Sequence, residues 1–355
     1  MKQALIYSTL RSDGRFFSDL VRALAAQTVH CTVIAAAEGN GGLRFRRPRL
    51  PESAFAALML LPLWYGLALI SLLAKKASGI ETVICCGYSE KVILSPIARL
   101  LKLNVVWLEF PNADQRLLTG WYGRALQRAA RSAKRVVFSS QAKQQLSTGG
   151  HDRFSVILPA ALQETERYQE DMFRRLASGE RRRFVIGSII ETLDKSLIER
   201  LLSGLSIART VSAEMELVII GEGETRKQLQ WLIRKMNLDR YVWLVGDAER
   251  SLQWLEHLSV YVLASTHPGL DEIGGALAAM NRGVPVLADR QAGIDDIINA
   301  KTGALLDMAD SETLARHLLK LEQDEELCRA LGREAKLRTE RLTFAALASE
   351  LALLL

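Results

Sequence analysis

The stretch Glu216-Leu-Val-Ile-Ile-Gly221-Glu-Gly223-Glu-Thr-Arg-Lys-Gln-Leu229 carries the clearest sign of the fold. The run from Glu216 to Ile220 is short, apolar and rich in β-branched residues, which predicts a strand. Two glycines then mark a turn, and an amphipathic helical pattern follows from Thr225 to Met236. A strand that leads through a glycine turn into a helix is one βα unit of a parallel sheet.

The same alternation continues on both sides of this unit through the second half of the chain. The expected strands there are Phe184 to Ser188, Glu216 to Ile220, Val242 to Val245, Val260 to Ala264 and Pro285 to Ala288. The expected helices are Ser196 to Ile207, Thr225 to Met236, Ser251 to His257, Gly274 to Arg282, one near Asp295 and one from Ser311 onwards. These elements together predict a doubly wound α/β domain.

The first half of the chain shows a second set of alternating strands and helices. The expected strands are Gln3 to Ser8, Cys31 to Ala35, Thr82 to Cys86, Val105 to Glu109, Arg135 to Ser139 and Ser155 to Leu158. The expected helices are Arg15 to Ala26, Ala54 to Ala74, Lys91 to Leu101 and Tyr122 to Ser132. The chain therefore contains two βα series, each of which could form its own parallel sheet.

A polar, charge-dense segment at 159–183 separates the two series and is the best candidate for a domain boundary. We expect an amino-terminal Rossmann-like domain over 1–165 and a carboxyl-terminal one over 184–340. The tail 341–355 is expected to be a helix that packs back on the first domain. Ligands of such α/β sheets bind at the carboxyl ends of the strands, so an active site is expected in a crevice that the two domains face.

Composition is consistent with a globular protein of two cores. At 355 residues the chain is too long for one ordinary core, and 49% of its residues are hydrophobic. A net charge of +6 favours anionic partners, which include nucleotide diphosphates, acidic lipid headgroups and nucleic acid. The four cysteines show no metal-ligand spacing, and the chain starts without a secretory signal. These features favour a cytoplasmic location.

The stretch from Ala54 to Ala74 has no charged residue, although basic residues flank it on both sides. Its length would suffice to cross a bilayer, but Pro62 and Gly66 interrupt it. Three readings stay open: a helix at the surface of an anionic membrane, a helix packed on the sheet, and a membrane span. The first is favoured, because lysines and arginines beside an apolar helix bind acidic lipid.

Ordered blocks of the second half resemble glycosyltransferase family 4, whose members have the GT-B fold. These blocks are Gly187-Ser-Ile-Ile-Glu191-Thr-Leu-Asp-Lys195, the stretch quoted above, Tyr241 to Gly246, Tyr261 to Val286 with Ala279-Met280 and Gly283-Val-Pro285, and Gly293 to Leu306. In the first half, Arg11-Ser-Asp13-Gly14-Arg15 is similar to a variant of the family's opening loop. The resemblance implies a GT-B fold of two Rossmann-like domains.

The resemblance also implies an activity. It points to a retaining, hexosyl-type glycosyltransferase that takes a sugar from a nucleotide-sugar donor and transfers it without a metal or cofactor. The acceptor would be a lipid-linked glycan or polysaccharide of the bacterial cell surface, such as lipopolysaccharide. An enzyme of this kind would work at the inner face of the cytoplasmic membrane, would contact its anionic surface and would not bind nucleic acid.

Several residues are candidates for the site that this activity needs. A donor diphosphate requires backbone amides and a cation, which Gly274, Gly275 and Ala276 at a helix start and Lys195 could supply. Glu272, with Asp271 as the neighbouring alternative, is the candidate carboxylate for hydrogen bonds to the donor sugar, and Glu109 is the candidate acid of the first domain. The remaining candidates for binding the donor are Gly14, Arg15, Glu191, Gly221, Gly223 and Ser265.

The sequence departs from the family pattern at three places. Ala278 stands where the family carries its second glutamate, Glu191 replaces an arginine beside the phosphate lysine, and Phe110 replaces a histidine. Two alternatives therefore stay open beside the transferase. One is a GT-B protein that has lost catalysis and serves as partner or scaffold of another glycosyltransferase, and the other is a GT-B enzyme of different chemistry, such as an epimerase.

Overall fold

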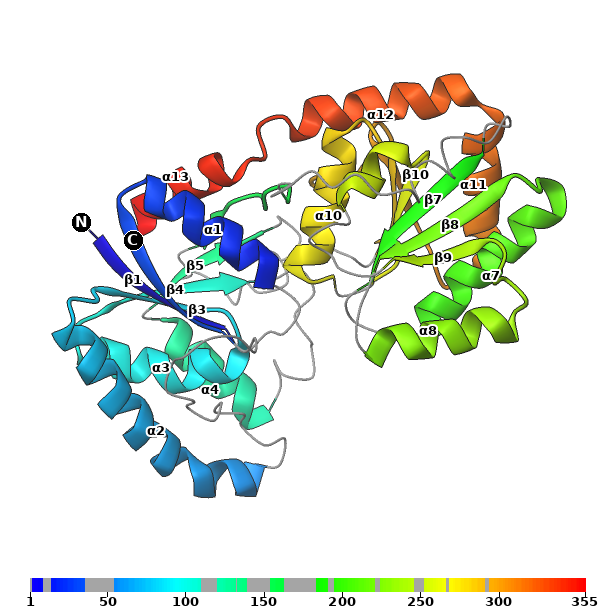
Figure 1. Cartoon of the computed structure of the whole chain (residues 1–355). Coiled ribbons are helices and arrows are strands. Elements are labelled where there is room, and N and C mark those ends of the chain that lie inside the picture. The colour runs from blue at the N-terminus through cyan, green and yellow to red at the C-terminus, as the bar shows by residue number, and fades with distance from the viewer. Residues whose placement is uncertain are drawn as a thin grey trace. The chain divides into compact units, whose positions relative to one another are not determined.

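The computed structural model of the chain forms two compact units, drawn in Figure 1. It describes residues 2–8, 14–35, 54–109, 120–131, 133–138, 154–162, 183–190, 195–220, 224–245, 252–265, 268–290 and 294–355. Unit 1 comprises Met1–Leu158 and Phe344–Leu355, and unit 2 comprises Pro159–Thr343. Residues 159–162, expected in the first domain, therefore belong to unit 2.

Unit 1 is built on a six-stranded parallel sheet of order β2-β1-β3-β4-β5-β6. Its strands are β1 (Lys2–Ser8), β2 (Val29–Ala35), β3 (Thr82–Cys85), β4 (Asn104–Glu109), β5 (Lys134–Val137) and β6 (Phe154–Val156). The central strands are buried runs of apolar residues, as a parallel sheet covered on both faces requires.

Helices cover both faces of this sheet. Its helices are α1 (Gly14–Ala26), α2 (Ala54–Ala77), α3 (Tyr88–Leu100), α4 (Gly120–Ala130) and α13 (Phe344–Leu354). Helices α2, α3 and α4 share one apolar cluster that includes Leu72 and Trp107, whereas α1 packs with α13 on the other face (Figure 1). The ring of Phe16 in α1 lies 5.1 Å from that of Phe344.

Helix α2 is the apolar stretch singled out in the sequence. It packs against α3, where the Tyr65 hydroxyl donates a hydrogen bond to the Val92 carbonyl, and Leu72 is buried. Its outer side is nevertheless apolar, since Leu63, Ile70 and Leu73 have exposed fractions of 58%, 64% and 47%. In the described ranges, no helix has the length and apolar character needed to cross a membrane.

Three side chains hold the end of α13 at the amino-terminal edge of the unit 1 sheet. Lys2 Nζ donates to the carbonyl of Ala352 at 3.1 Å, and Lys134 Nζ donates to that of Leu354 at 2.7 Å. The Thr82 hydroxyl donates to the Leu355 carbonyl. The last carbonyls of a helix lack partners within the helix and carry partial negative charge, so the two ammonium groups satisfy and stabilise them.

Unit 2 repeats the architecture with a parallel sheet of order β12-β11-β10-β7-β8-β9. Its strands are β7 (Phe184–Ile189), β8 (Met215–Ile220), β9 (Val242–Val245), β10 (Val260–Leu263), β11 (Val286–Asp289) and β12 (Gly303–Leu306). Strand β12 was not expected from the sequence. Together the two sheets confirm the predicted fold class, α/β with two Rossmann-like parallel sheets.

The helices of unit 2 form two layers around its sheet. They are α7 (Lys195–Val211), α8 (Glu224–Lys235), the short η2 (Leu252–His257), α10 (Leu270–Asn281), α11 (Ser311–Gln323) and α12 (Glu325–Thr339). Helices α7, α8 and α11 share one apolar cluster, and α10 lies on the opposite face with α12 packed on it (Figure 1).

Two helix predictions in unit 2 are wrong. Helix α10 begins at Leu270 rather than Gly274, because Glu272 caps its first turn and the acidic residues of the expected loop are helical and buried. The helix expected near Asp295 is only a turn at residues 295–297.

Candidate functional site

The candidate residues lie at the carboxyl ends of strands in both units, where ligands of parallel α/β sheets bind. Glu109 is the last residue of β4 in unit 1. In unit 2, Lys195 opens the helix after β7, and Ser265 follows β10 and is partly exposed. Gly14 is the first residue of α1 and Arg15 the second, after β1. Glu191, Gly221 and Gly223 lie outside the described residues.

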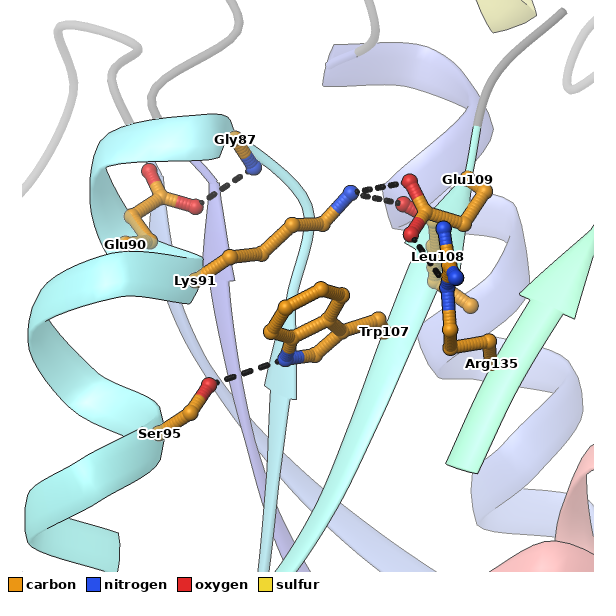
Figure 2. A network of polar contacts seen from close by, with 8 residues as sticks. All are labelled: Gly87, Glu90, Lys91, Ser95, Trp107, Leu108, Glu109 and Arg135. Atoms are coloured by element: carbon orange, nitrogen blue, oxygen red, sulfur yellow. Dashed lines mark hydrogen bonds and ion pairs between the residues drawn. The ribbon is translucent and has the colours of Figure 1, made fainter. Parts of the chain in front are cut away.

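Glu109 is held by two cations in a buried network, shown in Figure 2. One carboxylate oxygen pairs with Lys91 Nζ at 2.7 Å, and the other pairs with Arg135 Nε at 3.0 Å. Lys91 Nζ also donates to the Leu108 carbonyl at 2.9 Å. The Glu109 residue has an exposed fraction of only 3%. Both carboxylate oxygens are therefore engaged, and two ion pairs tie Glu109 to α3 and β5.

Trp107 lies close to both cations of this network. Lys91 Nζ lies 5.6 Å from the Trp107 ring centroid, and the Arg135 guanidinium carbon lies 5.8 Å from it. The ring is fixed because its Nε1 donates to the Ser95 hydroxyl at 2.9 Å (Figure 2). Cations over an indole face are attracted by its quadrupole, so the ring supports both ion pairs.

The network is balanced in formal charge. A second buried acid, Glu90, accepts a hydrogen bond from the Gly87 amide at 2.7 Å. The two acids Glu90 and Glu109 therefore equal in number the two buried cations, Lys91 and Arg135. Burial, and then the charge of Glu90, raises the pKa of the neighbouring Cys85 thiol well above its ordinary value. The surroundings in this part of unit 1 thus keep the Cys85 thiol neutral.

Sequence reasoning missed Lys91, Arg135 and Trp107. The signal that could have found the two cations is their place directly before the apolar runs 92–94 and 136–138, since a lysine or arginine is rarely buried unless paired. Pairing Glu109 with a residue on α3 and another on β5 nevertheless requires the fold, because all three are far apart in sequence.

Glu272 is engaged within its own helix. It lies in the first turn of α10, where its carboxylate accepts a hydrogen bond from the Gly269 amide at 3.1 Å. Glu272 and the neighbouring Asp271 are both buried. Glu272 therefore acts as a capping residue of α10, a role that any acid in a first helical turn can play.

Gly274, Gly275 and Ala276 do not form a helix start. They lie inside α10, so their amides bond within the helix and are not offered to a diphosphate. A β-carbon on Gly274 would lie 2.8 Å from Leu162 Cγ, and one on Gly275 would lie 2.3 Å from Ile189 Cδ1. The Leu162 amide also donates to the Gly274 carbonyl at 3.1 Å. Here the glycines allow close packing of α10.

Lys195 remains the accessible cation among the predicted site residues of unit 2. It is the first residue of α7 and is exposed. Its ammonium group lies 5.5 Å from the ring centroid of Trp231 on α8. In the ranges that the structure describes, no group of three His, Cys, Asp or Glu side chains is placed to hold a metal ion.

A cavity of about 400 Å³ in unit 2 lies away from these candidates. It opens at the amino-terminal ends of β7, β10 and β11, where Arg183, Ser259 and Pro285 line it. Ligands of parallel α/β sheets bind at the opposite edge. The cavity therefore lies at the edge of the sheet opposite to the one that holds the candidate residues.

Comparison with known proteins agrees with this geometry. Residues 190–338 match the family described as glycosyl transferases group 1. Capsular polysaccharide biosynthesis glycosyltransferase CapM from Staphylococcus aureus is 24% identical over 161 residues, which cover 44% of this chain and 41% of CapM. A Campylobacter jejuni enzyme named N-acetylgalactosamine-N,N'-diacetylbacillosaminyl-diphospho-undecaprenol 4-alpha-N-acetylgalactosaminyltransferase is 24% identical over 131 residues, 37% of this chain and 36% of the enzyme. The chain thus matches less than half the length of these relatives.

Solved structures match the whole chain at low sequence identity. Sucrose-phosphate synthase from Thermosynechococcus elongatus has a TM-score of 0.76 and 17% identity, covering 100% of this chain and 98% of its own. HepE from Anabaena, in complex with UDP and glucose, has a TM-score of 0.70 and 16% identity over 99% of this chain and 98% of its own. WaaG, a glycosyltransferase involved in lipopolysaccharide biosynthesis, has a TM-score of 0.68 and 16% identity, covering 99% of this chain and 98% of its own.

Two parallel six-stranded sheets with helices on both faces, matched by these structures over their full length, define a protein of the GT-B fold. Within that fold, residues 190–338 match the family described as glycosyl transferases group 1, in agreement with the resemblance seen in the sequence.

Proposed function

We propose that this protein is a glycosyltransferase that moves a sugar from a nucleotide-sugar donor to a lipid-linked or polysaccharide acceptor in the synthesis of a bacterial cell-surface glycan. The observation that carries the proposal is the group 1 match over the residues that include Lys195, β8 and α10. Names of relatives support the acceptor class, since one is a capsular polysaccharide enzyme and another acts on a diphospho-undecaprenol glycan.

The donor side of the proposal rests on unit 2. Lys195 is exposed at the start of α7, at the carboxyl edge of the sheet, so its ammonium could pair with a diphosphate there. HepE, which shares the fold, was solved with UDP. We expect transfer with retention of anomeric configuration and without a metal ion, as the family resemblance implies.

Donor binding is the experiment that tests this function. Calorimetric titration of the whole chain with UDP, GDP and ADP, followed by the corresponding nucleotide sugars, should give saturable binding of one nucleotide. The same titrations with and without EDTA test the expected independence from metal. Binding of none of them would contradict the transferase and favour a partner protein that has lost catalysis.

The alternative of a lapsed partner protein has one specific observation in its favour. Ala278, where the family carries a glutamate, is completely buried in α10, whose residues from Leu270 to Met280 are all buried. A partner protein need not bind a nucleotide sugar, whereas the transferase must. An epimerase would instead isomerise its donor in the absence of any acceptor, which proton NMR of the donor detects.

The proposed membrane contact rests on α2. Leu63, Ile70 and Leu73 form an exposed apolar strip on this helix, and Lys75 and Lys76 lie in its last turn. Apolar side chains beside lysines bind the surface of an anionic bilayer, which would keep the enzyme near a lipid-linked acceptor at the inner face of the cytoplasmic membrane.

Sedimentation with vesicles tests this contact. An Ile70→Glu, Leu73→Glu variant should lose sedimentation with vesicles of phosphatidylglycerol, while Leu353→Glu should not, although Leu353 on α13 is 83% exposed. Equal sedimentation of all three proteins would remove the membrane surface from the proposal and leave donor binding untouched.

A further inference from the structure

Trp231 is a large aromatic side chain on the surface of unit 2. It lies on α8 with an exposed fraction of 55%. Two ammonium groups approach its ring, Lys195 Nζ at 5.5 Å and Lys235 Nζ at 5.1 Å from the centroid. Both distances are within the range of a cation–π interaction.

The two lysines reach Trp231 from different elements. Lys235 is on the same helix, one turn after Trp231, a spacing at which side chains of a helix meet. Lys195 comes from the start of α7, which follows the adjacent strand β7. Of these two lysines, Lys195 is therefore the one that lies both at the carboxyl edge of the sheet and beside the indole ring.

We infer that Trp231 is a positioning residue: it holds the Lys195 ammonium in the donor-free protein and releases it when a diphosphate binds, while Lys235 stays on the ring. The inference rests on the proposed function, because it assumes that Lys195 pairs with the donor diphosphate.

The relative strengths of the two interactions favour movement of the Lys195 ammonium from the indole ring to the diphosphate. A cation–π contact at an exposed site is weak, equivalent to about a two- to fivefold change in an equilibrium constant. An ion pair of a lysine with a phosphate is a charge-assisted hydrogen bond and is stronger. Donor binding can therefore draw Lys195 from the ring, but it must overcome the cation–π contact first.

The two like charges on one ring also oppose each other. Lys235 repels Lys195 and so weakens the hold of Trp231 on Lys195. Removing the ring should free Lys195, and removing Lys235 should fix it more firmly. A purely structural role of Trp231 does not predict opposite effects of these two changes.

The experiment is a calorimetric titration of UDP, or of whichever diphosphate the wild-type chain binds best, into four variants. Trp231→Leu should tighten binding about two- to fivefold, whereas Lys235→Met should weaken it about twofold. Lys227→Met, an exposed lysine of the same helix, controls for the loss of one positive charge. In the Trp231→Leu, Lys235→Met double variant the effect of Lys235→Met should shrink to that of Lys227→Met, as a double-mutant cycle detects.

Fluorescence gives a second readout, which should not change on diphosphate binding if Trp231 has only a structural role. The emission of Trp231, obtained as the difference between wild type and Trp231→Phe, should change when the diphosphate binds, because a charge leaves the indole face. In Lys195→Met the same difference spectrum should be insensitive to the diphosphate at saturating concentration.

The possible outcomes distinguish failure of this inference from failure of the proposed function on which it rests. If the wild-type chain binds no nucleotide, the proposed function fails. If it binds, and Trp231→Leu weakens binding or leaves it unchanged, the inference is overturned while the function stands. Opposite signs for Trp231→Leu and Lys235→Met, with a fluorescence change that needs Lys195, establish it.

Discussion

The two sheets have the same parallel, six-stranded construction but present different chemistry at their carboxyl edges. In unit 1 the acid at the end of β4, Glu109, is buried and paired with both Lys91 and Arg135. In unit 2 the cation that follows β7, Lys195, is exposed and contacts only a weak partner, the Trp231 ring, among the interactions described for it.

This difference separates a residue that fixes structure from one that can receive a ligand. A buried carboxylate with two ion pairs is expensive to disturb, because losing one partner leaves uncompensated charge in the interior. An exposed ammonium over an indole ring is easily moved. We therefore expect changes at Glu109 to act on folding and changes at Lys195 to act on binding.

The largest effect should come from Glu109. Glu109→Ala leaves Lys91 and Arg135 buried without their carboxylate, so the free energy of unfolding should fall by about 3–5 kcal/mol. Urea unfolding followed by circular dichroism measures this. Glu81→Gln, at an exposed acid of unit 1, should change it by less than about 0.5 kcal/mol. A fully stable Glu109→Ala protein with lost activity would instead restore Glu109 as a catalytic acid and break the comparison.

A smaller loss is expected where the backbones of unit 2 touch. A β-carbon on Gly332 of α12 would lie 2.0 Å from the Gly283 carbonyl oxygen, so Gly332→Ala should destabilise the protein by about 1–3 kcal/mol. Gly66 of α2 has no atom within 4 Å of such a β-carbon, and Gly66→Ala should stabilise it by about 0.5–1 kcal/mol. Thermal unfolding of the pair checks both signs, and equal shifts would contradict the close packing of α12.

The hydrogen bonds to the last carbonyls of α13 should contribute less to the free energy of unfolding than this packing does. Lys134→Met removes one donor from the last carbonyls of α13 and should cost about 0.5–1.5 kcal/mol. Hydrogen exchange should show faster exchange of the α13 amides, with that of β8 in unit 2 unchanged. Lys102→Met, at an exposed lysine of unit 1, is the matched control. If Lys134→Met leaves α13 exchange as in wild type, the lysine is not part of its hold.

The smallest structural effect is a titration within unit 1. Burial raises the pKa of the Cys31 thiol to about 11, from an ordinary value of 9.0, because the thiolate is poorly solvated there. At pH 8 the thiolate fraction should thus be about a hundredfold lower than that of an ordinary thiol. Iodoacetamide labelling of Cys31, followed by peptide mass spectrometry, should be slow at pH 8 and speed up about tenfold per pH unit up to pH 10. Labelling as fast as in urea-unfolded protein would show that unit 1 tolerates an unpaired charge.

Much of the fold could be predicted because its strands are apolar runs followed by turns. The strand β8 and the helix α8 that follows it match their predictions closely, because local periodicity in the sequence and two glycines define them. Strand β12 was missed because Gly303-Ala-Leu-Leu306 is short and gains its partners only from β11. The start of α10 was missed because Asp271 and Glu272 resemble loop residues, whereas in the structure both lie in the first turn of the helix and are buried.

The candidate site could be predicted less well, because its chemistry depends on contacts distant in sequence. Lys195 and Glu109 were identified from motif positions, but their partners were not. Gly274 and Gly275 show the opposite failure: a pair of glycines near a predicted helix start resembles a phosphate-binding turn, whereas the structure uses them for packing against Leu162 and Ile189.

The return of the chain to unit 1 through α13 has a consequence for synthesis. Strands β1 to β6 leave the ribosome first, yet their sheet lacks α13 until the whole of unit 2 has been made. Until then the apolar surface around Phe16 that Phe344 covers is open to solvent. The first unit to emerge is thus the last to be finished, and a fragment that stops at Leu158 would expose that surface permanently.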